Sequence, residues 1–285
     1  MDSQPIPAQG RYVLGSDDHE LTRLDRQAAF IGPATHLLLQ AAGLSTGLRV
    51  LDLGTGLGHV ARLAGGLVGP TGSVVGVDRA ARPLAVARQR VEAAGETHIS
   101  FVEGDVVTWC GDEPFDAVVG RLVLFHLADP VMAVRHHLQN LRGNGLFVAI
   151  DFDIGAMRTE PPIAMVDAGA EWVKQAFSAA GASPMIGARL GPILTQAGLD
   201  NVTTFGVQAY IPPRDPAGAA LLAGVVRSLA GEIARRGIAT AEELDIDTLE
   251  RRIADEIQRN DAVLLPPTVV GAWGRRVGAD AAVIS

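Results

Sequence analysis

The residues best suited to chemistry in this sequence form a glycine-rich turn between Asp52 and Gly58, which reads D-L-G-T-G-L-G. A short apolar segment precedes the turn and a helical pattern follows it, so the turn connects a strand to a helix. Glycine lets the backbone reverse tightly and approach a ligand closely. The N-terminus of the following helix offers unpaired N–H groups. A tight turn without a ligand would have the same local sequence, so the turn alone is weak evidence of binding.

Asp78 is the second residue of interest, because it ends the next apolar segment along the chain. Ligands of open α/β sheets lie beyond the carboxyl ends of the strands, and an acid at this position accepts hydrogen bonds from the ribose hydroxyls of a nucleoside. Asp78 is equally suited to cap the helix that follows. The two roles are compatible, and together with the turn they indicate a nucleoside ligand.

The spacing of the glycines distinguishes two kinds of nucleoside cofactor. The turn reads G-x-G-x-G, whereas a dinucleotide site reads G-x-G-x-x-G, and His59 stands where its last glycine would be. Asp52 would also repel a pyrophosphate, but it suits a ligand that carries an ammonium group. S-adenosylmethionine has an ammonium group, a sulfonium group and no phosphate, so the sequence favours it over a nicotinamide dinucleotide.

Three residues are candidates for catalysis, a histidine and two carboxylates at the end of a strand. His126 follows the predicted fourth strand and has a reference pKa near neutrality, so it is suited to remove a proton from a hydroxyl or an amine. Packing near the cofactor is the alternative role for this histidine. Asp151 and Asp153 lie at the end of the predicted fifth strand, where one of them would act as a base or hold a substrate amine, although carboxylates at strand ends are more often solvated or cap loops.

These residues require an α/β framework to position them. Continuously apolar segments alternate with helical segments in the middle of the chain, which is typical of parallel strands covered on both faces. The pattern predicts a doubly wound, mostly parallel sheet. The expected strands cover residues 49–53, 73–77, 99–102, 115–119 and 146–150, and the expected helices cover 60–67, 82–94 and 131–141.

The two ends of the chain have different patterns. The first fifteen residues read as an arm, and two helices are expected between Asp17 and Ala42, separated by a break at Gly32-Pro33. After Asp153, helices are expected over 164–180, 190–197, 217–236 and 241–258, and strands over 202–210 and 269–275.

Composition excludes several functions. The net charge of −8 argues against a nucleic-acid partner, because such binding depends on Lys and Arg that neutralise phosphates. A single cysteine, Cys110, excludes an internal disulfide and a multi-thiolate zinc site, and no spacing predicts another metal site. The N-terminus lacks the features of a signal peptide, and the apolar segments are too short to span a membrane. A cytoplasmic protein without a membrane partner is therefore expected.

Taken in order, these segments resemble the motifs of class I S-adenosylmethionine-dependent methyltransferases, the group that includes the ubiquinone/menaquinone-type enzymes and many natural-product methyltransferases. The resemblance covers about Leu48 to Asp153. It implies a Rossmann-like, seven-stranded sheet that ends in an antiparallel hairpin, with an N-terminal helical lid over residues 1–45. The cofactor domain would cover 46–285, with substrate-side helices within 155–260 as an insertion near the C-terminus.

The resemblance also implies roles for individual residues. The first motif would hold the methionine part of the cofactor, Asp78 the ribose, and Asp105 the adenine amino group. The fourth motif would end near the methyl group. The implied cofactor-binding residues are Tyr12, Asp52, Gly54, Thr55, Gly56, Gly58, Asp78, Arg79, Asp105, Val106, Arg121 and His126.

The expected function is methyl transfer to an O, N or C nucleophile of a small, apolar metabolite, as in secondary metabolism, by in-line displacement at the methyl group. Two alternatives share much of the same sequence pattern. One is an enzyme of this fold that binds S-adenosylmethionine but catalyses a reaction such as cyclisation. The other is a nicotinamide-dependent oxidoreductase. A homodimer is compatible with the sequence.

Overall fold

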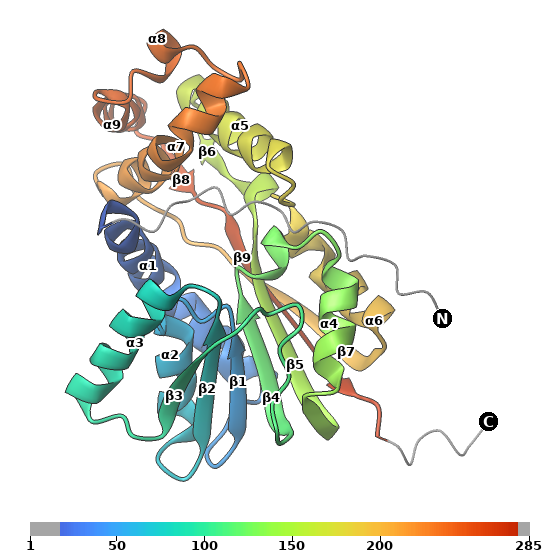
Figure 1. Cartoon of the computed structure of the whole chain (residues 1–285). Helices are drawn as coiled ribbons and strands as arrows, with labels where there is room; N and C mark the ends of the chain where they lie inside the picture. Colours follow the sequence, from blue (N-terminus) through green and yellow to red (C-terminus); the bar gives the residue numbers. More distant parts are fainter. Residues whose placement is uncertain (1–17, 279–285) are drawn as a thin grey trace.

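A computed structural model describes residues 18–278 of the chain and contains a central sheet of seven strands (Figure 1). Five strands are parallel, and β9 and β7 continue the sheet in antiparallel pairing. The predicted mostly parallel, doubly wound sheet with a final hairpin is therefore confirmed. In spatial order the strands are β3 (Ile99–Glu103), β2 (Ser73–Asp78), β1 (Arg49–Leu53), β4 (Phe115–Arg121), β5 (Leu141–Asp153), β9 (Thr268–Arg276) and β7 (Leu199–Val207).

Helices cover both faces of this sheet. One apolar cluster joins three helices to one face, and a second cluster joins two other helices to the opposite face. Because both faces are covered, the central strands β1 and β4 are buried over most of their length, as the sequence pattern indicated, whereas the edge strand β3 is exposed at three of its five positions. The first set is α1 (Asp18–Ala42), α2 (His59–Val68) and α3 (Ala81–Ala94), and the second is α4 (Pro130–Leu138) and α6 (Leu190–Ala197).

The segment before the first strand differs from the prediction. It forms one helix, α1, that continues through Pro33, so the expected break at Gly32-Pro33 is wrong. Proline removes one helical N–H donor, but the residues on both sides of it remain anchored. Ile31 and Leu38 are both buried in the same cluster, and the Thr35 hydroxyl donates a hydrogen bond to the Ile31 carbonyl at 2.8 Å. Packing of the apolar face therefore outweighs the local cost of the proline.

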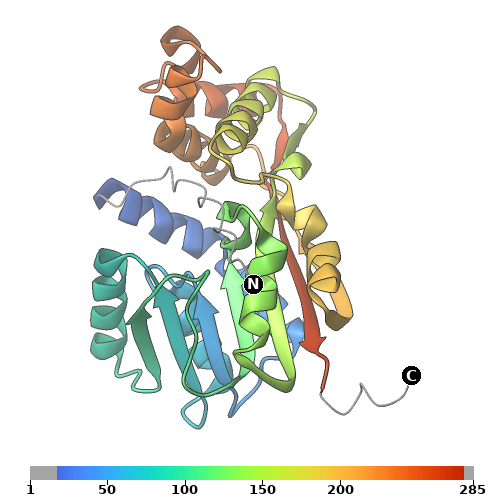
Figure 2. The ribbon, with the colours of Figure 1, turned by 45° about the vertical axis from the view of Figure 1, so that its right-hand side comes forward.

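A helical cap stands above the carboxyl edge of the sheet, with α1 between the two in both views (Figures 1 and 2). A two-stranded ribbon that the sequence pattern did not predict accompanies its helices. Within residues 155–260, β7 is a strand of the central sheet and α6 packs against that sheet, whereas the other α-helices belong to the cap. The cap elements are β6 (Arg158–Glu160), α5 (Ala164–Ala179), α7 (Ala217–Arg235), α8 (Ala241–Leu244), α9 (Leu249–Arg259) and β8 (Val263–Leu265).

Two cap features correct the sequence analysis. The single helix expected over 241–258 is divided into α8 and α9, because Asp245 adopts a left-handed conformation with φ of 32°. Among the described residues, α7 is long and apolar enough to cross a membrane by length and composition alone. This corrects the expectation that every apolar segment is too short to do so. The buried side chains of α7, such as Leu222, Val226 and Leu229, belong to the apolar cluster that also includes α5 and α9.

Candidate functional site

The glycine-rich turn leaves open space at one position only. Gly54, Gly56 and Gly58 all have positive φ, of 62°, 52° and 78°. A β-carbon on Gly54 would lie 2.6 Å from the Val123 side chain, and one on Gly58 would lie 2.9 Å from Phe101. A β-carbon on Gly56 would meet no atom closer than 4.0 Å. Packing therefore encloses Gly54 and Gly58, whereas the backbone at Gly56 is open to the approach of a ligand.

Asp78 fixes the shape of this turn from the end of the neighbouring strand. Its carboxylate accepts a hydrogen bond from the Gly56 N–H at 2.9 Å and another from the Ala80 N–H at 2.9 Å. The N-cap residue of α3 is Ala80, so Asp78 is not the helix cap that the sequence also suggested. An acid at this position holds the turn and the strand end in one arrangement, next to the place where the resemblance puts a ribose.

Asp52 and Thr55 are buried polar residues whose side-chain oxygens have no hydrogen-bond partner among the described residues. Burial raises the pKa of Asp52 to about 7, despite the opposing influence of the Thr55 hydroxyl and of the Arg121 charge. Buried polar groups are normally paired, so two such side chains beside the open Gly56 point to a polar ligand.

Arg121 ends β4 and lies close enough to Asp52 for their charges to interact. Its guanidinium donates a hydrogen bond to the Thr35 hydroxyl of α1 at 3.0 Å. Burial lowers the pKa of Arg121 to about 10, which leaves it charged at neutral pH. A cation and an acid thus face the same region from neighbouring strands, and α1 holds the cation in place.

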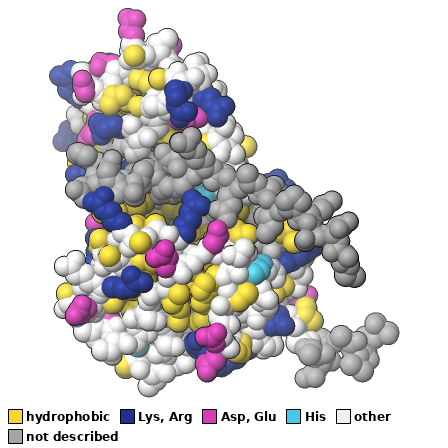
Figure 3. All heavy atoms as spheres, in the orientation of Figure 1, with side chains coloured by type: hydrophobic (Ala, Val, Ile, Leu, Met, Phe, Trp, Pro, Cys, Tyr) yellow, Lys and Arg dark blue, Asp and Glu magenta, His cyan; other side chains and the backbone are white. Residues whose placement is uncertain are grey.

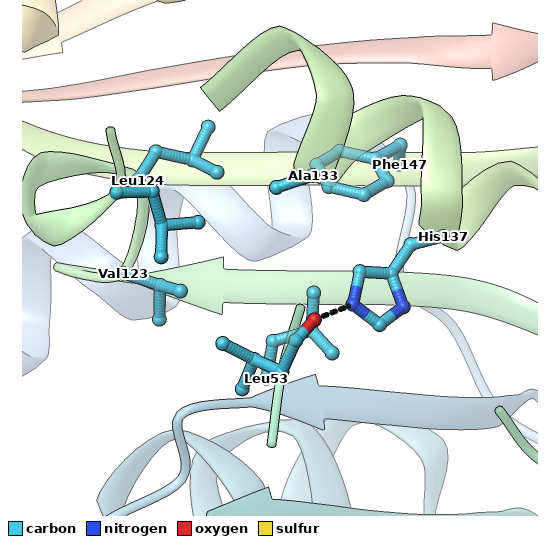
Figure 4. A pocket seen from close by; sticks show the side chains of 8 residues that line it. Leu53, Val123, Leu124, Ala133, His137 and Phe147 are labelled. Carbon is cyan, nitrogen blue, oxygen red and sulfur yellow. Dashed lines mark hydrogen bonds between the residues drawn. The ribbon is translucent and has the colours of Figure 1, made fainter. Parts of the chain in front are cut away.

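The loop after β3 contains Asp105 and Val106, the predicted adenine contacts. The Asp105 carboxylate accepts a hydrogen bond from the Val107 N–H at 2.9 Å, which closes a tight turn. The Val106 carbonyl accepts a hydrogen bond from Nε2 of His137 on α4 at 2.5 Å (Figure 4). Nδ1 of His137 then accepts from the Asn140 amide at 2.9 Å. Burial lowers the pKa of His137 to about 4, so a neutral, buried imidazole fixes this loop.

A small apolar pocket lies beneath the same loop, between β1, the segment after β4, α4 and β5 (Figure 4). Apolar side chains and the His137 ring line it, so its interior is apolar. The lining residues are Leu53, Val106, Val123, Leu124, Leu127, Ala133, His137 and Phe147.

His126 ends η1 (Leu124–His126), the short helical turn that faces the cap. The neighbouring Phe125 ring packs edge to face against His126 and also against Phe177 of α5, with ring centroids 4.9 and 4.8 Å apart. Burial, with the nearby charges of Arg79 and Arg23, lowers the pKa of His126 to about 4. His126 is therefore a neutral imidazole at neutral pH. The face shown in Figure 3 carries Lys and Arg side chains along the level between cap and sheet.

Asp151, another catalytic candidate, lies beneath η1. It is fully buried, and burial raises its pKa well above the ordinary value although the backbone N–H groups of Phe125 and Leu124 oppose that change. Burial therefore favours the neutral form of the Asp151 carboxyl group. Its side-chain oxygens have no hydrogen-bond partner among the described residues, and its role as a base or as a contact for a substrate amine stays a prediction. Tyr12, the predicted contact from the lid, lies outside the described residues.

Sequence reasoning missed one cluster at the rim of the site. Asp25 of α1 binds Arg90 of α3 through two hydrogen bonds, and His59 at the start of α2 lies 2.8 Å from the same carboxylate. His59 is 34 positions and Arg90 is 65 positions from Asp25, so no local spacing reveals either contact. Among residues 18–278, no group of three His, Cys, Asp or Glu side chains could hold a metal ion.

The observed features fit a cofactor that carries an ammonium, a carboxylate and a nucleoside. Asp52 and Arg121 supply opposite charges and Gly56 leaves room, while Asp78 ends β2 and Val106 follows β3 at the same edge of the sheet. A pyrophosphate would instead meet the carboxyl group of Asp52.

Comparisons with known proteins identify the family of the chain. Residues 44–198, more than half of the chain, match the family described as a methyltransferase domain. The chain is 34% identical over 116 residues to the ubiquinone/menaquinone biosynthesis C-methyltransferase UbiE of Pseudomonas savastanoi. That alignment covers 40% of this chain and 45% of the relative, so the chain spans less than half the length of that curated relative.

Two solved structures share the fold at low identity. Phosphoethanolamine N-methyltransferase 2 of Haemonchus contortus, in complex with phosphomonomethylethanolamine and S-adenosylhomocysteine, has a TM-score of 0.55 at 18% identity, covering 86% of this chain and 52% of that one. The [4+2]-cyclase SpnF has a TM-score of 0.52 at 21% identity, covering 86% and 82%. Fold, cofactor motifs and family match agree: the chain belongs to the methyltransferase-domain family of class I S-adenosylmethionine-dependent enzymes.

Proposed function

We propose that this protein transfers the methyl group of S-adenosylmethionine to a small, largely apolar molecule held between the carboxyl edge of the sheet and the helical cap. One observation supports the cofactor most directly. The unpartnered Asp52 and Thr55 side chains lie beside the open backbone at Gly56, with the Arg121 cation nearby.

The opposite charges at this position match the two charges of an α-amino acid. In the proposed arrangement, Asp52 receives the ammonium group of the methionine part and Arg121 receives its carboxylate. Pairing would also compensate the cost of burying each group alone. Asp78 and the Val106 loop would then hold the ribose and the adenine on the side toward β3.

The cofactor supplies the reactivity, because its sulfonium makes the methyl group electrophilic. The protein would contribute alignment and exclusion of water, and alignment alone lowers such barriers by roughly 7–11 kcal/mol. The buried Phe125 and Phe177 support an apolar acceptor site. The neutral His126 imidazole would accept a hydrogen bond, and then a proton, from an acceptor hydroxyl or amine.

A binding experiment tests the cofactor assignment without an acceptor. Calorimetry would compare S-adenosylmethionine with its decarboxylated analogue, using wild type and Arg121→Met. We expect the substitution to weaken binding of the intact cofactor at least tenfold and to leave the analogue nearly unchanged. Equal losses for both ligands would overturn the assigned role of Arg121, and binding of NADH in place of either ligand would overturn the cofactor.

Labelled methyl groups test the reaction itself. The purified protein would be incubated with methyl-labelled S-adenosylmethionine and a panel of apolar phenols, amines and enolisable ketones. Label in the product together with S-adenosylhomocysteine supports methyl transfer. An altered product that forms without label and without S-adenosylhomocysteine would replace this proposal by a non-methylating reaction such as cyclisation.

A further inference from the structure

One edge of the central sheet has, over part of its length, none of the features that normally prevent strands of different molecules from pairing. β7 is nine residues long and is the last strand in the order. Natural edge strands are usually short, or carry charged residues, prolines or bulges. β7 has an irregularity between Asp200 and Thr203, but residues 203–207 then pair regularly with β9. No Asp, Glu, Lys or Arg occurs between residues 201 and 213.

An exposed aromatic side chain lies in the regular part of this edge. Phe205 is 51% exposed and pairs with Gly271 of β9. Cross-strand partners point to the same face of a sheet. The Leu38 side chain of α1 lies 2.9 Å from the position of a Gly271 β-carbon, so Phe205 and α1 share one face. Val207, two residues along β7, packs against the same apolar cluster as Leu38.

The neighbouring part of α1 is also free of charge. No Asp, Glu, Lys or Arg occurs between residues 27 and 48. Pro33, Leu37 and Ala41 follow one another at four-residue spacing, and all three are exposed. Leu37 is 47% exposed. A charge-free strand edge and a charge-free helical stripe therefore adjoin in a chain whose net charge is −8.

We propose that this surface, made of residues 203–207 of β7 and the Pro33–Leu37–Ala41 stripe of α1, binds a second copy of the same chain. A two-fold axis perpendicular to the sheet makes two β7 strands antiparallel, so the same backbone donors and acceptors satisfy one another. Two chains that each carry a charge of −8 repel, and a charge-free contact brings them together with the least electrostatic cost.

The proposed dimer also has a consequence for the cofactor site, and this consequence rests on the proposed function. α1 contributes the surface stripe, and through Thr35 it also holds the Arg121 guanidinium. Contact with the second copy would therefore limit movement of the helix that completes the site.

Sedimentation equilibrium of the full chain tests the proposal. We expect a concentration-dependent mass that approaches twice 29.8 kDa. Phe205→Lys and Leu37→Lys place like charges opposite each other across the axis and should both give monomers. Val102→Lys is the matched control, because Val102 is a 39% exposed apolar residue on β3 at the other edge of the sheet. This control should remain dimeric.

Circular dichroism and melting temperature would establish that each variant is folded. A wild-type chain that stays monomeric at all concentrations overturns the proposal, as does a folded Phe205→Lys/Leu37→Lys double variant that stays dimeric. Loss of the dimer in the Val102→Lys control would place the interface at the β3 edge instead. Since mass is measured without cofactor, these outcomes are independent of the proposed methyl transfer.

Discussion

The carboxylate of Asp25 on α1 accepts hydrogen bonds from both terminal nitrogens of Arg90 on α3, at 2.9 and 2.8 Å. His59, the first residue of α2, lies 2.8 Å from the same carboxylate. Burial by itself would raise the pKa of Asp25, but the hydrogen bonds from Arg90 and His59 lower it overall. One carboxylate thus joins α1 to the two helices that follow the cofactor strands.

We predict that Asp25→Asn weakens cofactor binding more than it destabilises the fold. The ion pair is partly exposed, so solvent screening limits its contribution to stability to roughly 0.5 kcal/mol. Its position matters more, because α1 also carries Thr35, which holds Arg121. Calorimetry with S-adenosylhomocysteine should show a several-fold loss of affinity.

Glu113→Gln provides the control for this prediction, since the Arg49–Glu113 pair is a surface ion pair at the opposite edge of the sheet. The control should bind the ligand like wild type. If both variants bind like wild type, the contact between α1 and α3 has no role in the site.

Asp52 predicts a pH dependence of cofactor binding. Its raised pKa of about 7 means that the carboxyl group is partly protonated in the free protein at neutral pH. An ammonium ligand favours the ionised form, so affinity for S-adenosylhomocysteine should increase as the pH rises from 5.5 to 8. Asp52→Asn should bind weakly with a flat profile. An unchanged slope in this variant would assign the titration to another group.

The raised pKa of Asp52 also predicts how the free energy of unfolding changes with pH. Its folded pKa, about 7, lies above the unfolded value of about 3.9, so the folded state favours the protonated form. The resulting stabilisation is fully present below about pH 4 and is lost as the pH rises through 7, a change on the order of 4 kcal/mol. Chemical denaturation of the ligand-free protein should show this loss relative to Asp52→Asn. A pH-independent difference between the two proteins would contradict it.

The sequence was most informative where contacts are local. The strand–turn–helix order, the Asp52–Gly58 turn and the strand-end position of Asp78 follow from residue types at short spacing, and the sheet was predicted on that basis. Continuity of α1 through Pro33 depends on the burial of Ile31 and Leu38 against distant strands, which no local pattern encodes.

Site residues that depend on long-range contacts were missed for the same reason. Asp25 meets Arg90 across 65 positions, and Thr35 meets Arg121 across 86. The pairing of β6 with β8 joins segments about one hundred residues apart. The hydrogen bond between His137 and the Val106 carbonyl likewise joins residues 31 positions apart.

Gly56 tests whether the open space in the turn is the ligand site. Gly56→Ala adds a methyl group that meets no protein atom closer than 4.0 Å but points into that space. The positive φ should cost about 1 kcal/mol of stability. Cofactor affinity should fall by at least tenfold, because the methyl group occupies the position of the ligand.

Gly43→Ala is the matched control for that strain. Gly43 also has positive φ, 98°, and a β-carbon there would meet no atom within 4 Å. The control should lose a similar amount of stability and keep its affinity. Equal affinities in the two variants would show that the space beside Gly56 is not used for binding.

His126 provides the last prediction, and its protonation can be measured before an acceptor is known. Burial and the charges of Arg79 and Arg23 lower its pKa to about 4, so nuclear magnetic resonance should find its imidazole neutral above about pH 5. Comparison with His126→Gln assigns the signal. Once an acceptor is identified, His126→Gln should lower kcat by roughly 10²–10⁴-fold while the cofactor Kd stays within a factor of about three. A pKa near 6.5 would contradict the buried position, and an unchanged kcat would limit His126 to packing beside Phe125.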